Sequence, residues 1–224
     1  MEPYILEETG DFAVVFKPPQ MHSAPLKQKS DTLMDWYEEF FPSVIENGGL
    51  VHRLDFETQG LLLVAKNRKS LEFFRSLQKR GDFIKEYGAI CIESENSAPG
   101  FPPPPVFTGK PFSIESFFRP FGQGRKQVRP VTDKKHRELA KDQGGFYRTE
   151  ITNIKNNIFT VRIKRGFRHQ IRCHLSWIGR PILNDPLYGQ TLPDEGVFLA
   201  LRSQSLLFSD PSSGRIREYC IDSI

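Results

Sequence analysis

The most constraining feature of the sequence is a short, continuous apolar run, Leu61 to Ala65, that follows a polar stretch. Five consecutive apolar residues are typical of a strand buried on both faces, and Gly60 allows the backbone to turn just before it. The ionisable residues His52, Arg53 and Asp55 stand immediately ahead of this turn. A loop attached to a buried strand holds its side chains rigidly, as a reactive group requires.

The carboxylate of Asp55 has two interpretations from this stretch alone. An adjacent cation such as Arg53 favours the ionised form of a carboxylate even when the group is partly buried. The ordinary interpretation is an ion pair that ties down a loop, because structural ion pairs are common. The other is a reactive carboxylate, and both stay open at this point.

Length and composition indicate a globular protein. A chain of 224 residues makes one large domain or two small ones, and 38% apolar with 26% charged residues is typical of a soluble protein. Cys91, Cys173 and Cys220 are odd in number and widely spaced, so they predict neither a disulfide framework nor a zinc site. We see no signal peptide and no apolar run approaching ~18 residues, and therefore expect no membrane span and a cytoplasmic location.

The distribution of charge says more than its total. Lys plus Arg (31) exceeds Asp plus Glu (27) by only four over the whole chain. The segment 119–141, however, holds eight Lys or Arg and two acids, and 162–172 holds five Lys or Arg and no acid. Two basic segments on a near-neutral chain indicate contact with a polyanion, although a solvated charged loop is an equal alternative for the first.

Hydrophobic periodicity and turn residues predict an α+β domain with a mixed, mainly antiparallel sheet flanked by helices and loops. A proline-rich surface loop is expected at 94–105. The expected helices run from a cap at Ser30 or Asp31 to Pro42, from Asn67 to about Arg80, from Asp133 to Lys141, and from near Arg168 to Gly179. The expected strands lie at 4–7, 12–16, 61–65, 83–92, 112–117, 127–131, 146–154, 158–163, 198–201, 205–208 and 215–221.

Three separated segments match one family. Residues 51–63 resemble the HRLDxxTSGLLL motif of the RluA-like RNA pseudouridine synthases, and Lys85 to Ala89 resembles their KxYxA strand. Residues 166–189 resemble their GRTHQIRxHLxxxGxPIxGDxxYG segment, and residues 12–18 resemble their opening strand and Lys-Pro turn. The resemblance runs in register from about residue 10 to residue 212, which predicts one pseudouridine synthase catalytic domain over 1–224 without an S4 domain.

The resemblance implies isomerisation of uridine to pseudouridine in ribosomal or transfer RNA, with no cofactor and no metal. It makes Asp55 the nucleophile, attacking either the sugar or the base, and gives Tyr87 and Arg172 catalytic roles. Arg172 would keep the carboxylate ionised, and Tyr87 would stack on the target uracil. RNA contacts are expected from His52, Arg53, Lys85, Arg168, His169 and Gln170. The partner is structured RNA, no membrane is involved, and the expected state is a monomer.

The chain departs from the family pattern at several positions. Gln59 replaces the usual Ser, Gln20 stands where Gly commonly follows Lys-Pro-x, Phe167 and Arg168 replace Arg-Thr, and Arg202 replaces a common His. Two other functions compete with a synthase: a catalytically inactive RNA-binding protein on the same fold, and a metal-free hydrolase. An intact set of Asp55, Tyr87 and Arg172 argues against the first, and the missing nucleophile elbow or paired-carboxylate motif argues against the second.

Overall fold

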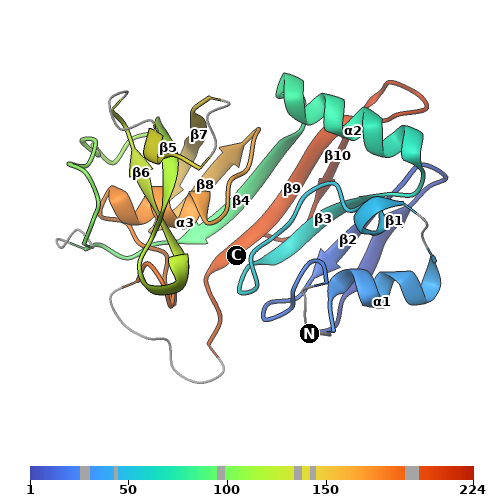
Figure 1. Ribbon diagram of the computed structural model, residues 1–224, viewed down its shortest axis with the longest axis horizontal. Helices are drawn as coiled ribbons and strands as arrows, with labels where there is room; N and C mark the ends of the chain where they lie inside the picture. The colour runs from blue at the N-terminus through green and yellow to red at the C-terminus, as the bar shows by residue number, and fades with distance from the viewer. Residues whose placement is uncertain (26–30, 43–44, 95–98, 134–137, 142–144, 190–196) are drawn as a thin grey trace. The chain divides into compact units, whose positions relative to one another are not determined.

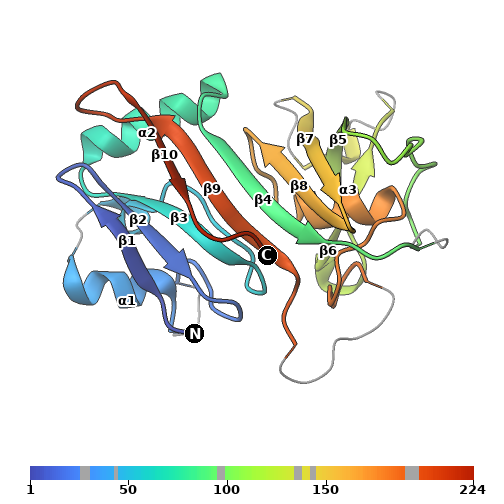
Figure 2. The ribbon, with the colours of Figure 1, turned by 180° about the vertical axis from the view of Figure 1, so that it is seen from behind.

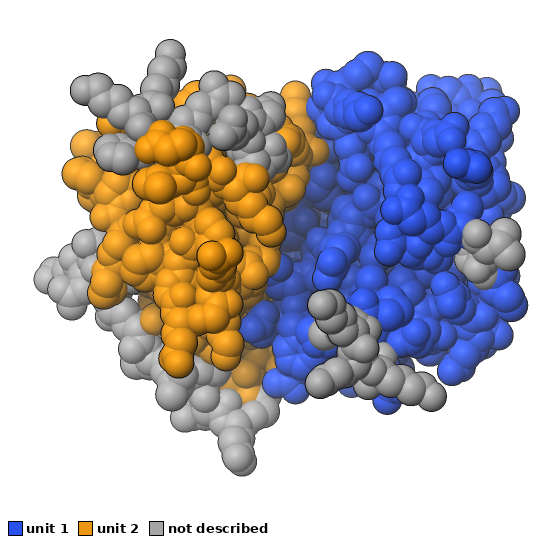
Figure 3. All heavy atoms as spheres, in the orientation of Figure 1, with its two compact units in different colours: residues 1–87, 202–223 blue, residues 88–201, 224 orange. Residues whose placement is uncertain are grey.

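The computed structural model describes residues 1–25, 31–42, 45–94, 99–133, 138–141, 145–189 and 197–224. The chain divides into two units, which Figure 3 colours separately. Unit 1 comprises residues 1–87 and 202–223, and unit 2 comprises residues 88–201 with Ile224. The boundaries of the predicted single domain stay a prediction, and each unit is described by itself.

The sheet of unit 1 is mixed. Its strand order is β1-β2-β3-β9, with β10 beside β9, and every neighbouring pair is antiparallel except the parallel pair β3 and β9. These strands are β1 (Tyr4–Glu8), β2 (Phe12–Lys17), β3 (Gln59–Ala65), β9 (Leu201–Ser209) and β10 (Ile216–Cys220). Strand β4 (Ile84–Ile90) begins in unit 1 and crosses the boundary between the units after Tyr87.

The core of unit 1 confirms that the apolar run is a strand buried on both faces. All seven residues of β3 and all six of β2 are buried. Helix α2 (Arg68–Arg80) lies in front of the sheet in Figure 1 and behind it in Figure 2, so it covers one face. Its Leu71, Phe74 and Leu77 pack with Phe12 and Phe208 in a single apolar cluster. This burial removes several large side chains from water, at about 1.5–3 kcal/mol for each.

The helices of unit 1 begin and end at capping residues. Asn67 accepts the amide of Ser70 at the start of α2, and Gly81, with a φ of 78°, ends it, both as the sequence predicts. Helix α1 (Leu33–Phe40) is capped by Thr32 in a capping box with Asp35, rather than by Asp31. The other proposed cap, Ser30, lies outside the described residues. A short 3-10 turn, η1 (Glu46–Gly49), leads to the segment that carries Asp55.

Unit 2 is built on the strand order β8-β7-β5-β6, all antiparallel. Its elements are β5 (Phe112–Phe121), η2 (Gln123–Arg125), β6 (Gln127–Val131), β7 (Tyr147–Lys155), β8 (Ile158–Ile163) and α3 (Gln170–Trp177). The first half of β5 pairs with β7 and the second half with β6. Asn156 and Asn157 adopt positive φ at the β7–β8 turn, as a tight two-residue hairpin turn requires.

The predicted α+β class with a mixed, mainly antiparallel sheet is confirmed, and two local predictions differ. Residues 201–209 form one strand, which contains the strand expected at 205–208, whereas residues 198–200 of the strand expected at 198–201 are not in a strand. The last helix begins at Gln170 because His169 has a φ of 57°, outside the helical region. Of the helix expected at 133–141, residues 134–137 lie outside the described residues.

We expect Gly60→Ala to destabilise the protein by more than about 2 kcal/mol. Gly60 has a φ of 120°, and an added Cβ would lie 2.2 Å from the carbonyl oxygen of Ser203 on β9. The β3–β9 pairing at this point would therefore have to open. Gly10→Ala is the matched control, since nothing lies within 4 Å of its Cβ position. Urea denaturation of both variants measures the effect, and equal midpoints would contradict it.

Candidate active site

The backbone around Asp55 is hydrogen-bonded at three consecutive residues. Leu54 donates its amide to Ser23 Oγ at 3.1 Å, and the same hydroxyl donates to the Leu54 carbonyl at 2.9 Å. The amide of Thr58 donates to the Asp55 carbonyl at 3.1 Å. The Asp55 side chain itself is partly exposed. The loop therefore presents a carboxylate from a fixed backbone, which matches the rigid loop expected from the sequence.

The third anchor is Lys17, the last residue of β2, whose side chain is fully buried. Its Nζ donates to the carbonyls of Pro18 and Met21, each at 2.8 Å, and to that of Phe56 at 3.3 Å. Burial lowers the pKa of Lys17 to about 7, and the carboxylates of Asp55 and Glu57 oppose this shift. Sequence analysis missed this residue, although a Lys at the end of a buried strand was a usable signal.

The ring nitrogens of His52 and the side chain of Lys85 are buried in unit 1. Both ring nitrogens of His52 are buried and have no hydrogen-bond partner among the described residues, and its ring meets Phe83 edge-on at 5.3 Å. Burial, reinforced by Lys85, lowers the pKa of His52 well below its usual value, so the ring is neutral. The ammonium of Lys85 lies 4.6 Å from the Phe83 ring centre, and burial lowers its pKa to about 8. The polar atoms of His52 and the side chain of Lys85 are therefore buried, whereas an ordinary phosphate contact faces solvent.

Tyr87 lies two residues beyond Lys85 on β4, and both side chains are buried, as the two-residue period predicts. Only 5% of Tyr87 is exposed. Burial and the nearby charge of Asp55 raise the pKa of the phenol, while a hydrogen bond with the Ser203 side chain opposes this rise. The structure thus brings Tyr87 into the electrostatic neighbourhood of Asp55.

Two solvent-facing side chains flank Asp55. Arg53 is exposed, and Phe56 is 39% exposed with its ring 4.6 Å from that of His22. An exposed cation and an exposed aromatic ring on either side of a carboxylate suit a nucleic-acid ligand, which offers phosphates and ring faces. The sequence pointed to Arg53 but not to Phe56 and His22.

In unit 2, Arg172 is fully buried on α3 and paired with Asp185. Its Nε and Nη2 donate to the two carboxylate oxygens of Asp185, each at 2.8 Å. Asp185 also accepts the amides of Leu187 and Tyr188, at 2.9 and 3.1 Å. This bidentate ion pair, in which both Asp185 oxygens accept hydrogen bonds, fixes the guanidinium in one orientation. Sequence analysis quoted Asp185 within a motif but gave it no role.

The residues before Arg172 divide into exposed and internal groups. Arg168 is exposed, donates to the carbonyl of Arg125 at 2.6 Å, and lies before the start of α3, which carries the buried Arg172. His169 Nδ1 lies 3.2 Å from the hydroxyl of Tyr188. Gln170 is buried and bonds to Arg148, Thr149 and Phe167 within unit 2. Arg168 faces solvent, whereas Gln170 holds the segment in place.

The basic segment at 119–141 is also not uniform. Arg129 is 2% exposed, with its guanidinium 4.3 Å from the Phe101 ring and 4.2 Å from the Phe121 ring. It donates to the Pro99 carbonyl at 2.9 Å, which fastens the proline-rich loop. Arg125 and Lys126 are exposed. One member of this segment is therefore structural, and Lys134, Lys135 and Arg137 lie outside the described residues.

The predicted residues thus fall into two groups. His52, Arg53, Asp55, Lys85 and Tyr87 belong to unit 1, and Arg168, His169, Gln170 and Arg172 belong to unit 2. Over the described part of the chain, no three His, Cys, Asp or Glu side chains are grouped to hold a metal ion. Within the same residues, no helix has the length and apolar character needed to cross a membrane.

Comparison with solved structures identifies the fold. The human RNA pseudouridylate synthase domain containing 1 matches with a TM-score of 0.70 and 20% identity, over 99% of this chain and 84% of that one. The human domain containing 4 protein matches with a TM-score of 0.68 and 17% identity, over 98% and 88% of the two chains. At these identities the likeness shows the fold alone.

Comparison with curated sequences extends the likeness. An uncharacterized RNA pseudouridine synthase of Bacillus subtilis, YjbO, is 29% identical over 92% of this chain and 68% of its own length. The ribosomal large subunit pseudouridine synthase D of Vibrio parahaemolyticus is 30% identical over 83% of this chain and 52% of its own. The chain thus spans between about half and two thirds of the length of these relatives.

A family profile provides the remaining evidence. The profile described as RNA pseudouridylate synthase matches residues 11–177, well over half of the chain and including the Asp55 loop, Tyr87 and all of α3. The resemblance to the RluA-like enzymes is confirmed by relatives named ribosomal large subunit pseudouridine synthase D. The chain belongs to the RNA pseudouridylate synthase family.

Proposed function

We propose that this chain isomerises specific uridines of RNA to pseudouridine, with Asp55 as the nucleophile. In this reaction the bond between the uracil nitrogen and the sugar breaks, the base turns, and a carbon–carbon bond forms to the same sugar. The observation that carries the proposal is the anchored loop: a partly exposed carboxylate on a backbone that Ser23, Lys17 and Thr58 hold. Fixed geometry of this kind favours nucleophilic attack, because the reacting group needs no reorganisation.

Several residues take supporting roles in this proposal. Arg53, which is exposed beside Asp55, contacts the RNA near the target nucleotide. Tyr87 stacks on the uracil, and Arg172 stabilises charge during the reaction. The role of Arg172 rests on the family motif, and the pair with Asp185 supports it by fixing the guanidinium in one orientation. Gln170 acts through the segment that it fixes, because its amide is used internally.

Ribosomal RNA is the substrate class that we propose first. Among the relatives, several are named ribosomal large subunit pseudouridine synthases, which favours ribosomal over transfer RNA. A cytoplasmic monomer stays the expected state. A transcriptome-wide map of pseudouridine in cells with and without the gene tests the proposal. Loss of specific ribosomal positions supports it, and an unchanged map contradicts it.

We expect Asp55→Asn to lower pseudouridine formation to below about a thousandth of the wild-type rate while RNA binding is kept. The amide is nearly the same size as the carboxylate but cannot act as a nucleophile. Chromatography of nucleosides from treated ribosomal RNA measures the carbon-linked product. Because the backbone anchors of the loop are untouched, the melting temperature should not change. Turnover at even a tenth of the wild-type rate would show that Asp55 is not the nucleophile.

Two substitutions of Tyr87 separate stacking from packing. Tyr87→Phe keeps the ring and should keep most of the substrate affinity, whereas Tyr87→Leu should lose about 1–3 kcal/mol of it. Tyr87→Phe also removes the hydrogen bond between the phenol and the Ser203 side chain. Apparent affinity and product formation are measured for both, with a thermal melt of each variant. A large loss of stability in the Leu variant with unchanged activity per folded molecule would make Tyr87 a packing residue.

We expect Lys17 to make the free energy of unfolding of the protein increase with pH above pH 7. Its folded pKa, about 7, lies below its ordinary value of 10.5, so the folded state binds fewer protons than the unfolded state between these pH values. The free energy of unfolding of the wild type, relative to Lys17→Met, should therefore rise by roughly 2 kcal/mol from pH 7 to pH 9. Urea denaturation at both pH values measures this difference. A constant or falling difference would show that the folded pKa is not lowered.

A further inference from the structure

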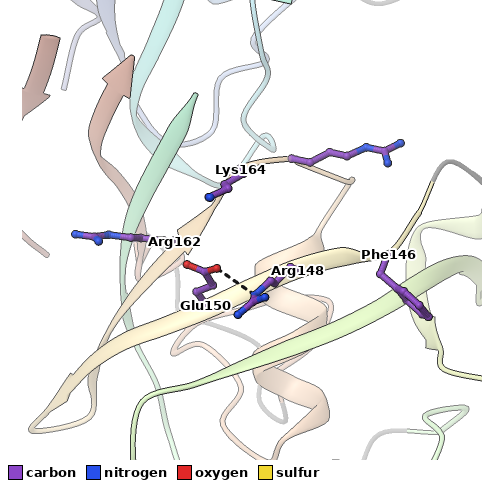
Figure 4. A pocket seen from close by; sticks show the side chains of 6 residues that line it. Phe146, Arg148, Glu150, Arg162 and Lys164 are labelled. Atoms are coloured by element: carbon purple, nitrogen blue, oxygen red, sulfur yellow. Dashed lines mark ion pairs between the residues drawn. The ribbon is translucent and has the colours of Figure 1, made fainter. Parts of the chain in front are cut away.

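A basic pocket opens on the surface of unit 2 (Figure 4). It has a volume of about 160 Å³ and is lined by Phe146, Arg148, Glu150, Arg162, Lys164 and Arg165. A single water molecule needs only about 10–15 Å³ on the same measure, so the pocket has room for a phosphate group. Its residues come from the β7–β8 hairpin and the segments next to it.

The pocket lies on the outer face of this hairpin. Thr149 on β7 and Val161 on β8 are buried, whereas their sequence neighbours Arg148 and Arg162 are exposed, as the alternation of a strand requires. The inner face packs against α3, because His174 Nδ1 lies 2.8 Å from Thr149 Oγ1. The pocket is therefore on the side of the hairpin opposite the helix that carries Arg172.

The lining has an excess of positive charge. It contains four cations and one carboxylate, that of Glu150. Arg148 Nε lies 3.0 Å from Glu150, and Arg148 Nη1 lies 3.5 Å from Glu115 outside the lining. Four cations and the one carboxylate of Glu150 give the lining a formal charge of +3, and counting Glu115 as well brings this to +2. A concave surface of this sign concentrates anions, and it does so most for a chain of phosphates.

An aromatic surface adjoins the cations. Phe146 is 43% exposed, and its ring rests on that of Phe117 at a centroid distance of 4.3 Å. The guanidinium of Arg165 lies 4.5 Å from the Tyr147 ring. An exposed ring beside a basic pocket is the combination that binds unpaired nucleotides, since a base stacks while the backbone meets the cations.

We propose that this pocket binds a phosphate of a single-stranded stretch of the RNA substrate, with an adjacent base stacked on Phe146. The surface is a second RNA contact, on the hairpin face away from α3, and it extends the binding site beyond the target nucleotide. The proposal rests on the proposed function only in taking RNA as the partner. The proposal predicts that binding through the pocket depends on the positive charge of the lining and on whether the RNA is single-stranded.

The test measures affinity by fluorescence anisotropy with the full chain and two labelled probes, a twelve-nucleotide oligouridylate and a twelve-base-pair RNA duplex. Arg162→Gln combined with Lys164→Gln should weaken oligouridylate binding roughly tenfold at physiological salt. The variant neutralises two fewer phosphates, so binding releases fewer counterions from the RNA. The log–log salt slope should fall by about 1.4. Lys69→Gln with Lys79→Gln removes two exposed charges from α2 and is the matched control, for which we expect less than a twofold change.

Two further variants keep the result interpretable. Arg162→Lys with Lys164→Arg keeps the charge and should bind within about threefold of the wild type, which separates lost charge from lost folding. Phe146→Leu should weaken oligouridylate binding at least about fivefold and leave duplex binding unchanged. A thermal melt accompanies every variant.

The outcomes separate this proposal from the proposed function. Equal affinity of the neutralised variant and the wild type overturns the pocket, even if the wild type forms pseudouridine in ribosomal RNA. If the neutralised variant loses only as much affinity as the Lys69 and Lys79 control, the proposal is also overturned. The loss would then reflect the net charge of the protein and not the pocket. Selective loss supports the pocket, even if no pseudouridine is found and the proposed function fails.

Discussion

The buried ammonium of Lys17 is the interaction on which the geometry around Asp55 depends. Its three carbonyl acceptors come from the turn after β2 and from the Asp55 loop, 39 residues further along the chain. A buried cation is costly unless it is hydrogen-bonded, so the carbonyls of Pro18, Met21 and Phe56 must converge on one point. Because all three acceptors are backbone carbonyls, these contacts fix the loop without using the Asp55 carboxylate. Strand β2 thereby positions the site without contributing a reactive group.

Two departures from the family motif form one contact in the structure. Gln59 and Arg202 are opposite each other in the parallel pairing of β3 and β9, and Arg202 Nη2 donates to Gln59 Oε1 at 3.4 Å. In the sequence, Gln59 and Arg202 are separate substitutions in distant segments. In the sheet they are neighbours, so a long cation and a long amide together replace two smaller polar residues. Arg202 also donates to the Asp222 carbonyl, so the exchange ties the end of the chain to β9.

Sequence reasoning predicted what depends on local pattern. The doubly buried strand β3, the caps of α2 and the β7–β8 turn follow from periodicity, Asn67, Gly81 and two asparagines. It failed where a polar residue finds a distant internal partner. Helix α3 reads as amphipathic, yet all eight of its residues are buried, because the polar ones are satisfied inside unit 2. Asp185 and Lys17 were passed over for the same reason, since their partners are not visible in the sequence.

The basic segment at 162–172 shows why charge in a sequence does not by itself define a binding surface. Arg172 is neutralised inside unit 2 by Asp185, whereas Arg162, Lys164 and Arg168 are exposed. Reversing an interior charge leaves its partner unpaired and is strongly destabilising, while changing an exposed cation alters mainly long-range attraction. The two groups are therefore free to change separately. Under the proposed RNA contact, substitutions on the outer face of the hairpin change the attraction for RNA without disturbing the buried pair of Arg172 and Asp185.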